Sequence, residues 1–280
     1  MSVILALAAS LFYGSADFLG GLATRRAPVL GVVVLSQAAG LALLLAALPL
    51  LPAAAPTHAD LAWGMAAGVT GGTGVALLYR ALALGPMSVV APVTAVCAIA
   101  VPVLVGLGLG ERPGPWALAG VLVAVAAIVL ISREPPTADE ARRGISLGVW
   151  LALASGVVIG AFYVCLSRTS TAAGMWPLVM ARTVSAALFV GTALARRQPA
   201  LPPRGAVPIV VLSGVLDMGA NVLYLLAVRG GMLSVVSTLA SLYPAATVML
   251  AAIVLRERLR GAQAVGLAFA AVAVALITAG

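Results

Sequence analysis

Three ionisable side chains lie inside long nonpolar runs, where charges are unusual. Asp17, Arg182 and Asp217 each have mostly apolar neighbours for several helical turns on both sides. If these runs are membrane helices, a charge near their centre costs about 2.5 to 3.5 kcal/mol on insertion scales. Charged residues that persist at such depths usually face protein or water and mark paths for solutes or ions. We therefore expect these three side chains at an internal polar site.

Arg182 and Asp217 are spaced so that they can form an ion pair. Arg182 lies 18 residues before position 200 and Asp217 lies 17 residues after it. Antiparallel helices joined near that position would place both at the same depth. Two interpretations stay open: a structural salt bridge that docks two helices, or a pair whose partners change when a proton or substrate binds. Asp17 has no obvious local partner, so it is the candidate for proton-linked coupling or for binding a substrate cation.

Hydroxyl and amide side chains accompany these charges. Asn221 follows Asp217 by one helical turn and shares its face, and Tyr224 continues that stripe. A hydroxyl group in a helix can also return its hydrogen bond to the backbone one turn earlier, so a purely structural role is the alternative for each one. The remaining candidates for contact with a solute are Tyr79, Thr94, Ser237, Ser241 and Tyr243.

Most other chemistries lack the residues that they need. All 16 basic residues are Arg, which excludes a lysine-containing phosphate loop and a Schiff-base lysine. The single histidine, His58, stands in a polar break, and the two cysteines, Cys97 and Cys165, lie apart in apolar runs. The chain therefore lacks the residues for a zinc site or a histidine-based catalytic triad. We expect no catalytic residue, no metal site and no cofactor.

Composition indicates the elements that must position these residues. Apolar residues make up 63% of the 280-residue chain and charged residues 9%, against about 25% charged in soluble proteins. This excludes a soluble protein and a nucleic-acid binder. A helix needs roughly 20 mostly apolar residues to cross a bilayer. The sequence predicts an all-α integral membrane protein with ten spans, at 2–22, 29–51, 61–83, 87–109, 115–132, 146–167, 175–195, 205–228, 232–255 and 261–279.

The two halves of the chain repeat each other. A shift of 146 positions places Glu111-Arg112 on Glu257-Arg258, Ser88 on Ser234 and Gly14 on Gly160. Because each copy has five spans, the second copy enters the membrane from the opposite side. We predict two inverted five-helix repeats, 1–132 and 146–280, joined by a polar loop at 133–145. Inverted repeats are typical of alternating-access carriers, although duplication could also have enlarged an inert bundle.

The repeated residues resemble a known family. The shared pattern is Tyr79, Gly85-Pro86, Ser88, Gly110-Glu111-Arg112 and Gly120, echoed from Tyr224 to Gly266, with Tyr13-Gly14-Ser15 and Arg25-Arg26 near the start. Over essentially the whole chain it resembles the EamA-like branch of the drug/metabolite transporter superfamily. The resemblance implies a permease or exporter of small metabolites. It also implies a central cavity lined mainly by the third, fourth, eighth and ninth helices, with contributions from the first and sixth.

Prolines mark candidate bending points for gating, because they remove a backbone donor inside a helix. Pro92 and Pro102 interrupt the fourth predicted helix, and Pro244 interrupts the ninth. The family pattern has a proline thirteen residues before the glutamate. Pro244 occupies that place in the second half, but Ala98 does so in the first, so we do not expect the two helices to bend equally.

The arginines give a topology that conflicts with the resemblance. The connections after the first, third, fifth, seventh and ninth spans carry 12 arginines, and the opposite set carries 3. The positive-inside rule then places both termini outside the cell, whereas the resemblance implies that both are cytoplasmic. Both orientations stay open, and a reporter fused to Gly280 would distinguish them.

We predict a secondary transporter of a small organic metabolite, such as an amino acid or a drug-like solute. It would work by alternating access, with protons as the candidate coupling ion. Its expected partners are that solute and the lipid bilayer, and its expected location is the cell (plasma or inner) membrane as a multi-pass protein. The few central charges favour zwitterionic or weakly polar solutes over polyanions. An intramembrane lipid-processing enzyme and a non-transporting scaffold stay open as alternatives.

Overall fold

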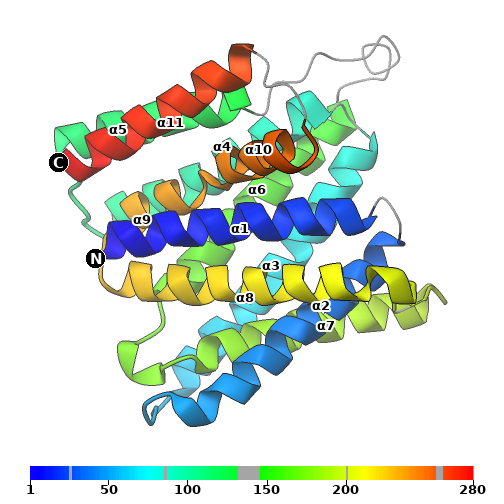
Figure 1. Ribbon diagram of the computed structural model, residues 1–280. Helices are drawn as coiled ribbons and strands as arrows, with labels where there is room; N and C mark the ends of the chain where they lie inside the picture. The colour runs from blue at the N-terminus through cyan, green and yellow to red at the C-terminus, as the bar shows by residue number, and fades with distance from the viewer. Residues whose placement is uncertain (25–26, 85–86, 132–145, 200, 257–260, 280) are drawn as a thin grey trace.

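The computed structural model describes residues 1–24, 27–84, 87–131, 146–199, 201–256 and 261–279, and these form helices joined by short connections (Figure 1). The side chains of 79, 82–84, 87–92 and 146 are also outside the described part. The helices are α1 (Ser2–Thr24), α2 (Val29–Ala47), α3 (His58–Leu84), α4 (Met87–Gly108), α5 (Pro115–Ile131), α6 (Ser146–Ser167), α7 (Trp176–Ala195), α8 (Val207–Arg229), α9 (Leu233–Ala240), α10 (Tyr243–Val254) and α11 (Gly261–Ala279).

These bounds confirm the predicted all-α fold, with two local differences. The third span begins at His58 instead of 61, because Thr57 and Asp60 cap it. The Thr57 backbone N–H and hydroxyl donate to the Asp60 carboxylate at 2.9 and 2.7 Å, and the Asp60 N–H donates back to the Thr57 hydroxyl at 3.2 Å. This reciprocal pair satisfies donors that a helix start leaves free.

The ninth predicted span is broken into α9 and α10. Pro244 stands in the first turn of α10, where it has no N–H to continue the preceding helix. By contrast, α4 runs unbroken across Pro92 and Pro102. The fourth and ninth spans thus differ in shape, as the replacement of the family proline by Ala98 indicates.

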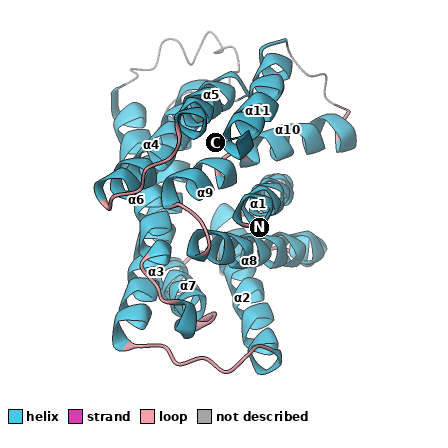
Figure 2. Ribbon diagram, turned by 90° about the vertical axis from the view of Figure 1, so that its left-hand side faces the viewer, coloured by secondary structure: helices cyan, strands magenta, loops and turns pink. Residues whose placement is uncertain are grey.

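The two halves are interleaved. The first helix of each half packs into the other half: α1 lies against α8, α9 and α10, and α6 lies against α3 and α4 (Figures 1 and 2). Other packing contacts follow the same symmetry. The contact of α3 with α7 in one half corresponds to that of α8 with α2 in the other, and the contacts α2–α7, α4–α9 and α5–α11 each join equivalent helices of the two halves. This pattern agrees with two copies of opposite orientation.

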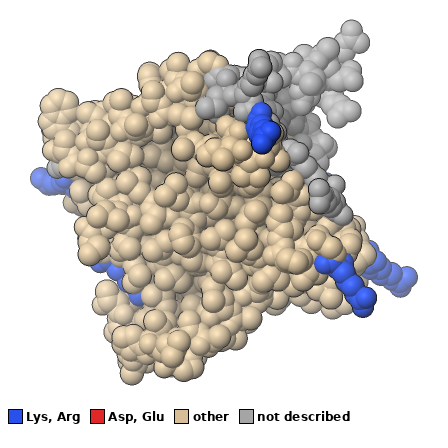
Figure 3. Space-filling view, in the orientation of Figure 1, with Lys and Arg blue, Asp and Glu red and all other residues tan. Residues whose placement is uncertain are grey.

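The arrangement suits a bilayer. In the described residues, eight helical segments are long and apolar enough to span it, and apolar parts of α4 and α5 are shorter. The face shown in Figure 3 has a wide area without acidic or basic side chains between its left and right margins. Both ends of the chain lie on one face, which we call the termini face (Figure 2). The starts of α1, α3, α5, α7 and α9 lie there too.

Glycines permit the closest helix contacts. A methyl group built at Gly68 of α3 would lie 2.5 Å from the Ala181 carbonyl oxygen of α7. Gly14 of α1 and Gly160 of α6, which the repeat makes equivalent, meet α10 and α4 in the same way. These small residues let the helix backbones approach one another closely.

Gly68→Ala should therefore destabilise the protein by about 1 to 3 kcal/mol, because an added methyl group forces α3 and α7 apart. The measurement is the midpoint of thermal unfolding in detergent. Gly191→Ala is the matched control, because it places the same methyl group in α7 with no atom within 4 Å. Equal midpoints for the two variants would contradict the tight α3–α7 contact.

Candidate functional site

A cavity of about 950 Å³ lies between the two halves. Its lining comes mainly from α1, α2, α3, α4, α6, α7, α8 and α10, with one residue each from α5 and α11. It reaches Thr24 at the end of α1, Leu255 after α10 and Gln263 at the start of α11, so it extends to the face opposite the termini face. Its volume falls within the roughly 300 to 1,000 Å³ usual for small-molecule sites.

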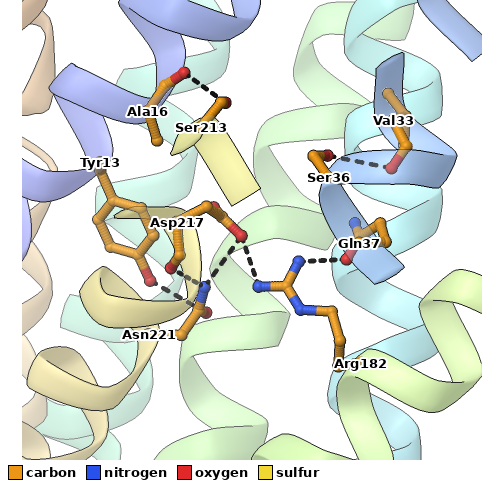
Figure 4. Close-up of polar contacts among 9 residues, drawn as sticks. All are labelled: Tyr13, Ala16, Val33, Ser36, Gln37, Arg182, Ser213, Asp217 and Asn221. Atoms are coloured by element: carbon orange, nitrogen blue, oxygen red, sulfur yellow. Dashed lines mark hydrogen bonds and ion pairs between the residues drawn. The ribbon is translucent and has the colours of Figure 1, made fainter. Parts of the chain in front are cut away.

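An ion pair lies at the centre of the cavity. The Arg182 Nη2 atom lies 2.5 Å from Oδ2 of Asp217, and Arg182 also donates to the side-chain oxygen of Gln37 (Figure 4). The pairing predicted from equal depth is confirmed. The Arg182 side chain is 9% exposed and the Asp217 side chain 36%. The guanidinium is therefore largely covered, and the carboxylate faces the cavity.

Asn221 extends this pair into a chain of hydrogen bonds. Its amide nitrogen donates to the Asp217 backbone oxygen at 2.7 Å, and its side-chain oxygen accepts from the Tyr13 hydroxyl at 3.1 Å. The contacts run from Tyr13 on α1 through α8 and α7 to Gln37 on α2 (Figure 4). One polar network thus joins two helices from each half.

Asp17 lies on the same helix as Tyr13, one turn further along, and faces the cavity. Its surface is exposed, and it makes no hydrogen bond or ion pair with any residue that the structure describes. Asp217 of α8 lines the same cavity. The Ser213 hydroxyl of α8 donates to the Ala16 carbonyl at 2.8 Å and fixes this part of α1 (Figure 4).

Aromatic side chains form much of the cavity wall. Tyr13 and Tyr243 meet edge to face, with ring centroids 6.4 Å apart. Phe162 and Tyr163 of α6 lie beside each other at 5.6 Å. These four rings line the cavity together with Phe18. Rings from α1, α6 and α10 therefore line the cavity that Asp17 faces.

The other predicted candidates divide into two groups. Thr94 and Tyr243 line the cavity, and the Thr94 hydroxyl donates to the Ala152 carbonyl at 3.2 Å. Tyr224, Ser237 and Ser241 are buried between helices and are not among the lining residues. The Tyr224 hydroxyl lies 2.9 Å from that of Ser237 and 3.3 Å from the Tyr163 carbonyl.

Ser241 of the buried group and the residues named for gating complete the set of candidates. Within the described residues the Ser241 hydroxyl has no hydrogen-bond partner. Pro244 lines the cavity and Pro102 is buried in α4. The side chains of Tyr79 and Pro92 lie outside the described part of the structure.

Carboxylates link the halves at the termini face. Glu111, after α4, accepts hydrogen bonds from the backbone N–H groups of Leu233 and Ser234 at 2.5 and 3.0 Å. It also accepts one from the Ser234 hydroxyl at 2.6 Å. Asp60 accepts from the backbone and hydroxyl of Ser170 at 2.6 and 3.1 Å. We call these two carboxylates and their partners the cross-half contacts.

Sequence reasoning missed Gln37, Tyr13 and the cross-half contacts as site features. A signal for Gln37 exists, because it precedes Arg182 by 145 positions, the same offset that relates Tyr79 to Tyr224. Glu111 belongs to the Gly-Glu-Arg triplet that the repeat singles out. No spacing rule shows which loop of the other half such a carboxylate meets.

Comparisons with known proteins agree with this architecture. A solved crystal structure is similar over 99% of this chain and 96% of its own, with a TM-score of 0.78 and 19% sequence identity. At that identity the likeness shows the fold alone. No curated protein matches the chain.

The comparison with protein families shows more than the fold. The EamA-like transporter family matches residues 1–133 and 146–279, one domain for each half. That match covers nearly the whole sequence and sets the enzyme alternative aside, because the family is one of transporters. The chain belongs to the EamA-like transporter family of the drug/metabolite transporter superfamily, and it is a multi-pass membrane transporter.

Proposed function

We propose that this transporter is a secondary carrier that moves a small organic metabolite across the cell membrane by alternating access. One observation carries the proposal: a central cavity built from both halves extends to one face, and cross-half contacts lie at the other. Toward the termini face the cavity wall includes Tyr163, near the end of α6, and Leu178, near the start of α7, which are 4% and 2% exposed. Export of amino acid-like or drug-like solutes is the activity that we expect.

The cross-half contacts are the groups that must separate when the termini face opens. The Glu111 carboxylate of the first half accepts hydrogen bonds from backbone N–H groups at the start of α9, and these N–H groups would otherwise lack partners. A negative charge there is also favoured by the helix dipole. Opening this face removes these hydrogen bonds and exposes their groups to water.

The break between α9 and α10 lets the two parts of the ninth span move separately. α9 packs against α4 and α1 near the termini face, and α10 provides Tyr243, Pro244 and Thr247 to the cavity. Because Pro244 has no backbone N–H to donate to the preceding turn, the backbone can turn there at low cost. A bend at this point would change access to the cavity without unwinding either helix.

Asp17 is the group that we assign to proton coupling. Its carboxylate faces the cavity without a partner in the described residues, and Asp217, Arg182, Tyr13, Tyr163 and Tyr243 are the charged and phenolic groups that share the cavity with it. Asp217 is balanced by Arg182. Asp17 is therefore the carboxylate that can gain or lose a proton without breaking an ion pair.

Asp17→Asn should abolish concentrative transport in proteoliposomes, because the variant cannot bind and release a proton. The measurement is a flux screen of labelled metabolites with purified protein, with and without a pH gradient. Asp17→Glu is the control that keeps the ionisable group. Uphill uptake of the same size in Asp17→Asn and wild type would remove Asp17 from coupling.

Glu111→Gln should loosen α9. Hydrogen bonds to a charged group contribute about 1.5 to 3 kcal/mol, so we expect deuterium exchange at the amides of Leu233 and Ser234 to rise by roughly tenfold or more. The measurement is hydrogen–deuterium exchange by mass spectrometry on the reconstituted protein. Arg112→Gln is the matched control, because Arg112 is exposed beside Glu111. Unchanged exchange in Glu111→Gln would show that this contact does not stabilise the termini face.

A further inference from the structure

The charges that line the cavity do not balance. Among the described lining residues, Asp17 and Asp217 are acidic and Arg182 is basic. Arg182 is occupied by Asp217 and Gln37, and 9% of its side chain is exposed. No cation in the described lining is therefore left for an anionic group of a solute. With both carboxylates ionised, these residues carry one net negative charge.

The unbalanced charge is concentrated at Asp17. Its carboxylate is exposed to the cavity and makes no hydrogen bond or ion pair with the described chain. Asp217, the other carboxylate of the lining, is paired with Arg182, so the net negative charge is that of Asp17. At the face to which the cavity opens, five described arginines are exposed and none of them lines the cavity: Arg80, Arg196, Arg197, Arg204 and Arg256.

The wall around Asp17 suits a cation that carries hydrocarbon. Tyr13, Tyr163 and Tyr243 line the same cavity as Asp17. Aromatic faces attract organic cations through the ring quadrupole, and recognition of quaternary ammonium groups uses such surroundings. A bare metal ion would need several oxygen or nitrogen ligands. The described residues contain no group of three or more His, Cys, Asp or Glu placed to supply them.

We propose that the solute of this carrier is a small organic cation, whose positive head group binds Asp17 among the rings of Tyr13, Tyr163 and Tyr243. The inference rests on the proposed function and narrows its solute class. Arg182 and Asp217 then serve to fix α7 and α8, and their pairing leaves Asp17 as the unbalanced charge in the described lining. A protonated Asp17 cannot pair with a cation, so a proton and the solute would bind this carboxylate in turn. The proposed proton coupling and the proposed cation site are therefore compatible.

The test is equilibrium binding of labelled phenyltrimethylammonium to the purified full-length protein in detergent. Competitors of similar size are phenylalanine as zwitterion, benzoate as anion and benzyl alcohol as neutral compound. We expect the quaternary cation to bind at least roughly tenfold more tightly than any of these. Asp17→Asn should raise its Kd by roughly tenfold or more, and Asp17→Glu should change it little.

Two further variants separate charge from folding. Asp217→Asn leaves Arg182 without its carboxylate, so binding of the cation should weaken and competition by benzoate should strengthen. Thermal unfolding of each variant shows that a loss of binding is not a loss of structure. Equal or tighter binding of phenylalanine or benzoate by wild type, an unchanged Kd in folded Asp17→Asn, or no binding of the cation would overturn the inference.

The binding and transport measurements test the cation site and the carrier proposal separately. If the cation binds selectively but reconstituted liposomes transport no solute, the carrier proposal fails and the cation site stands. If the liposomes transport a zwitterion while the cation does not bind, the carrier stands and the inference is wrong.

Discussion

The hydrocarbon core of a bilayer offers no hydrogen-bond partners, so every polar group at that depth must find one inside the protein or in a water-filled space. This constraint explains the arrangement of the polar residues described above. Arg182 is the most costly of these groups to bury. It donates hydrogen bonds to the Asp217 carboxylate of α8 and to the Gln37 amide oxygen of α2. Asp217 and Asn221 line the cavity, and the Asn221 side-chain oxygen accepts a hydrogen bond from the Tyr13 hydroxyl. Asp17, which lacks a partner in the described chain, is exposed to the cavity.

The interleaving of the halves provides these partners. No helix could satisfy Arg182 by itself, and the antiparallel pair α7–α8 needs α2 to complete the guanidinium contacts. Close contacts at Gly40 of α2 and Gly214 of α8 bring these two helices near enough for the Gln37, Asp217 and Arg182 side chains to meet. At the same time, the cavity surface is shared by helices of both repeats, so relative movement of the halves must change its shape.

The sequence predicted the helices well because membrane spans are defined by length and apolarity, which are local properties. It also predicted the ion pair, since the depth of Arg182 and Asp217 follows from their distance to one loop. The lining of the cavity was harder to predict. Tyr224 follows the stripe of Asp217 and Asn221, yet the neighbouring Tyr163 and Ser237 cover it. Which face a neighbour covers depends on contacts between distant segments.

The cross-half contacts illustrate the same limit. Glu111 was visible as a repeated residue, but its partners are Leu233 and Ser234, which lie 122 and 123 residues away. Thr57 and Asp60 had the spacing of a helix cap, which is local and could have been recognised. The hydrogen bond from the Ser170 backbone N–H of the other half to Asp60 could not have been recognised in this way. Local rules gave the elements, and the packing of distant segments decided which polar groups meet.

The interleaved packing also has a consequence for biosynthesis. The extensive partners of α1 are α8, α9 and α10, and those of α3 are α6 and α7. None of these exists until translation has passed the middle of the chain, and at about 5 to 20 residues per second the second repeat requires on the order of 10 s or more. During that interval the membrane insertion machinery must accommodate Asp17 and its helix without native neighbours. Arrested translation after the first repeat should therefore leave a segment that cellular quality control recognises as incomplete.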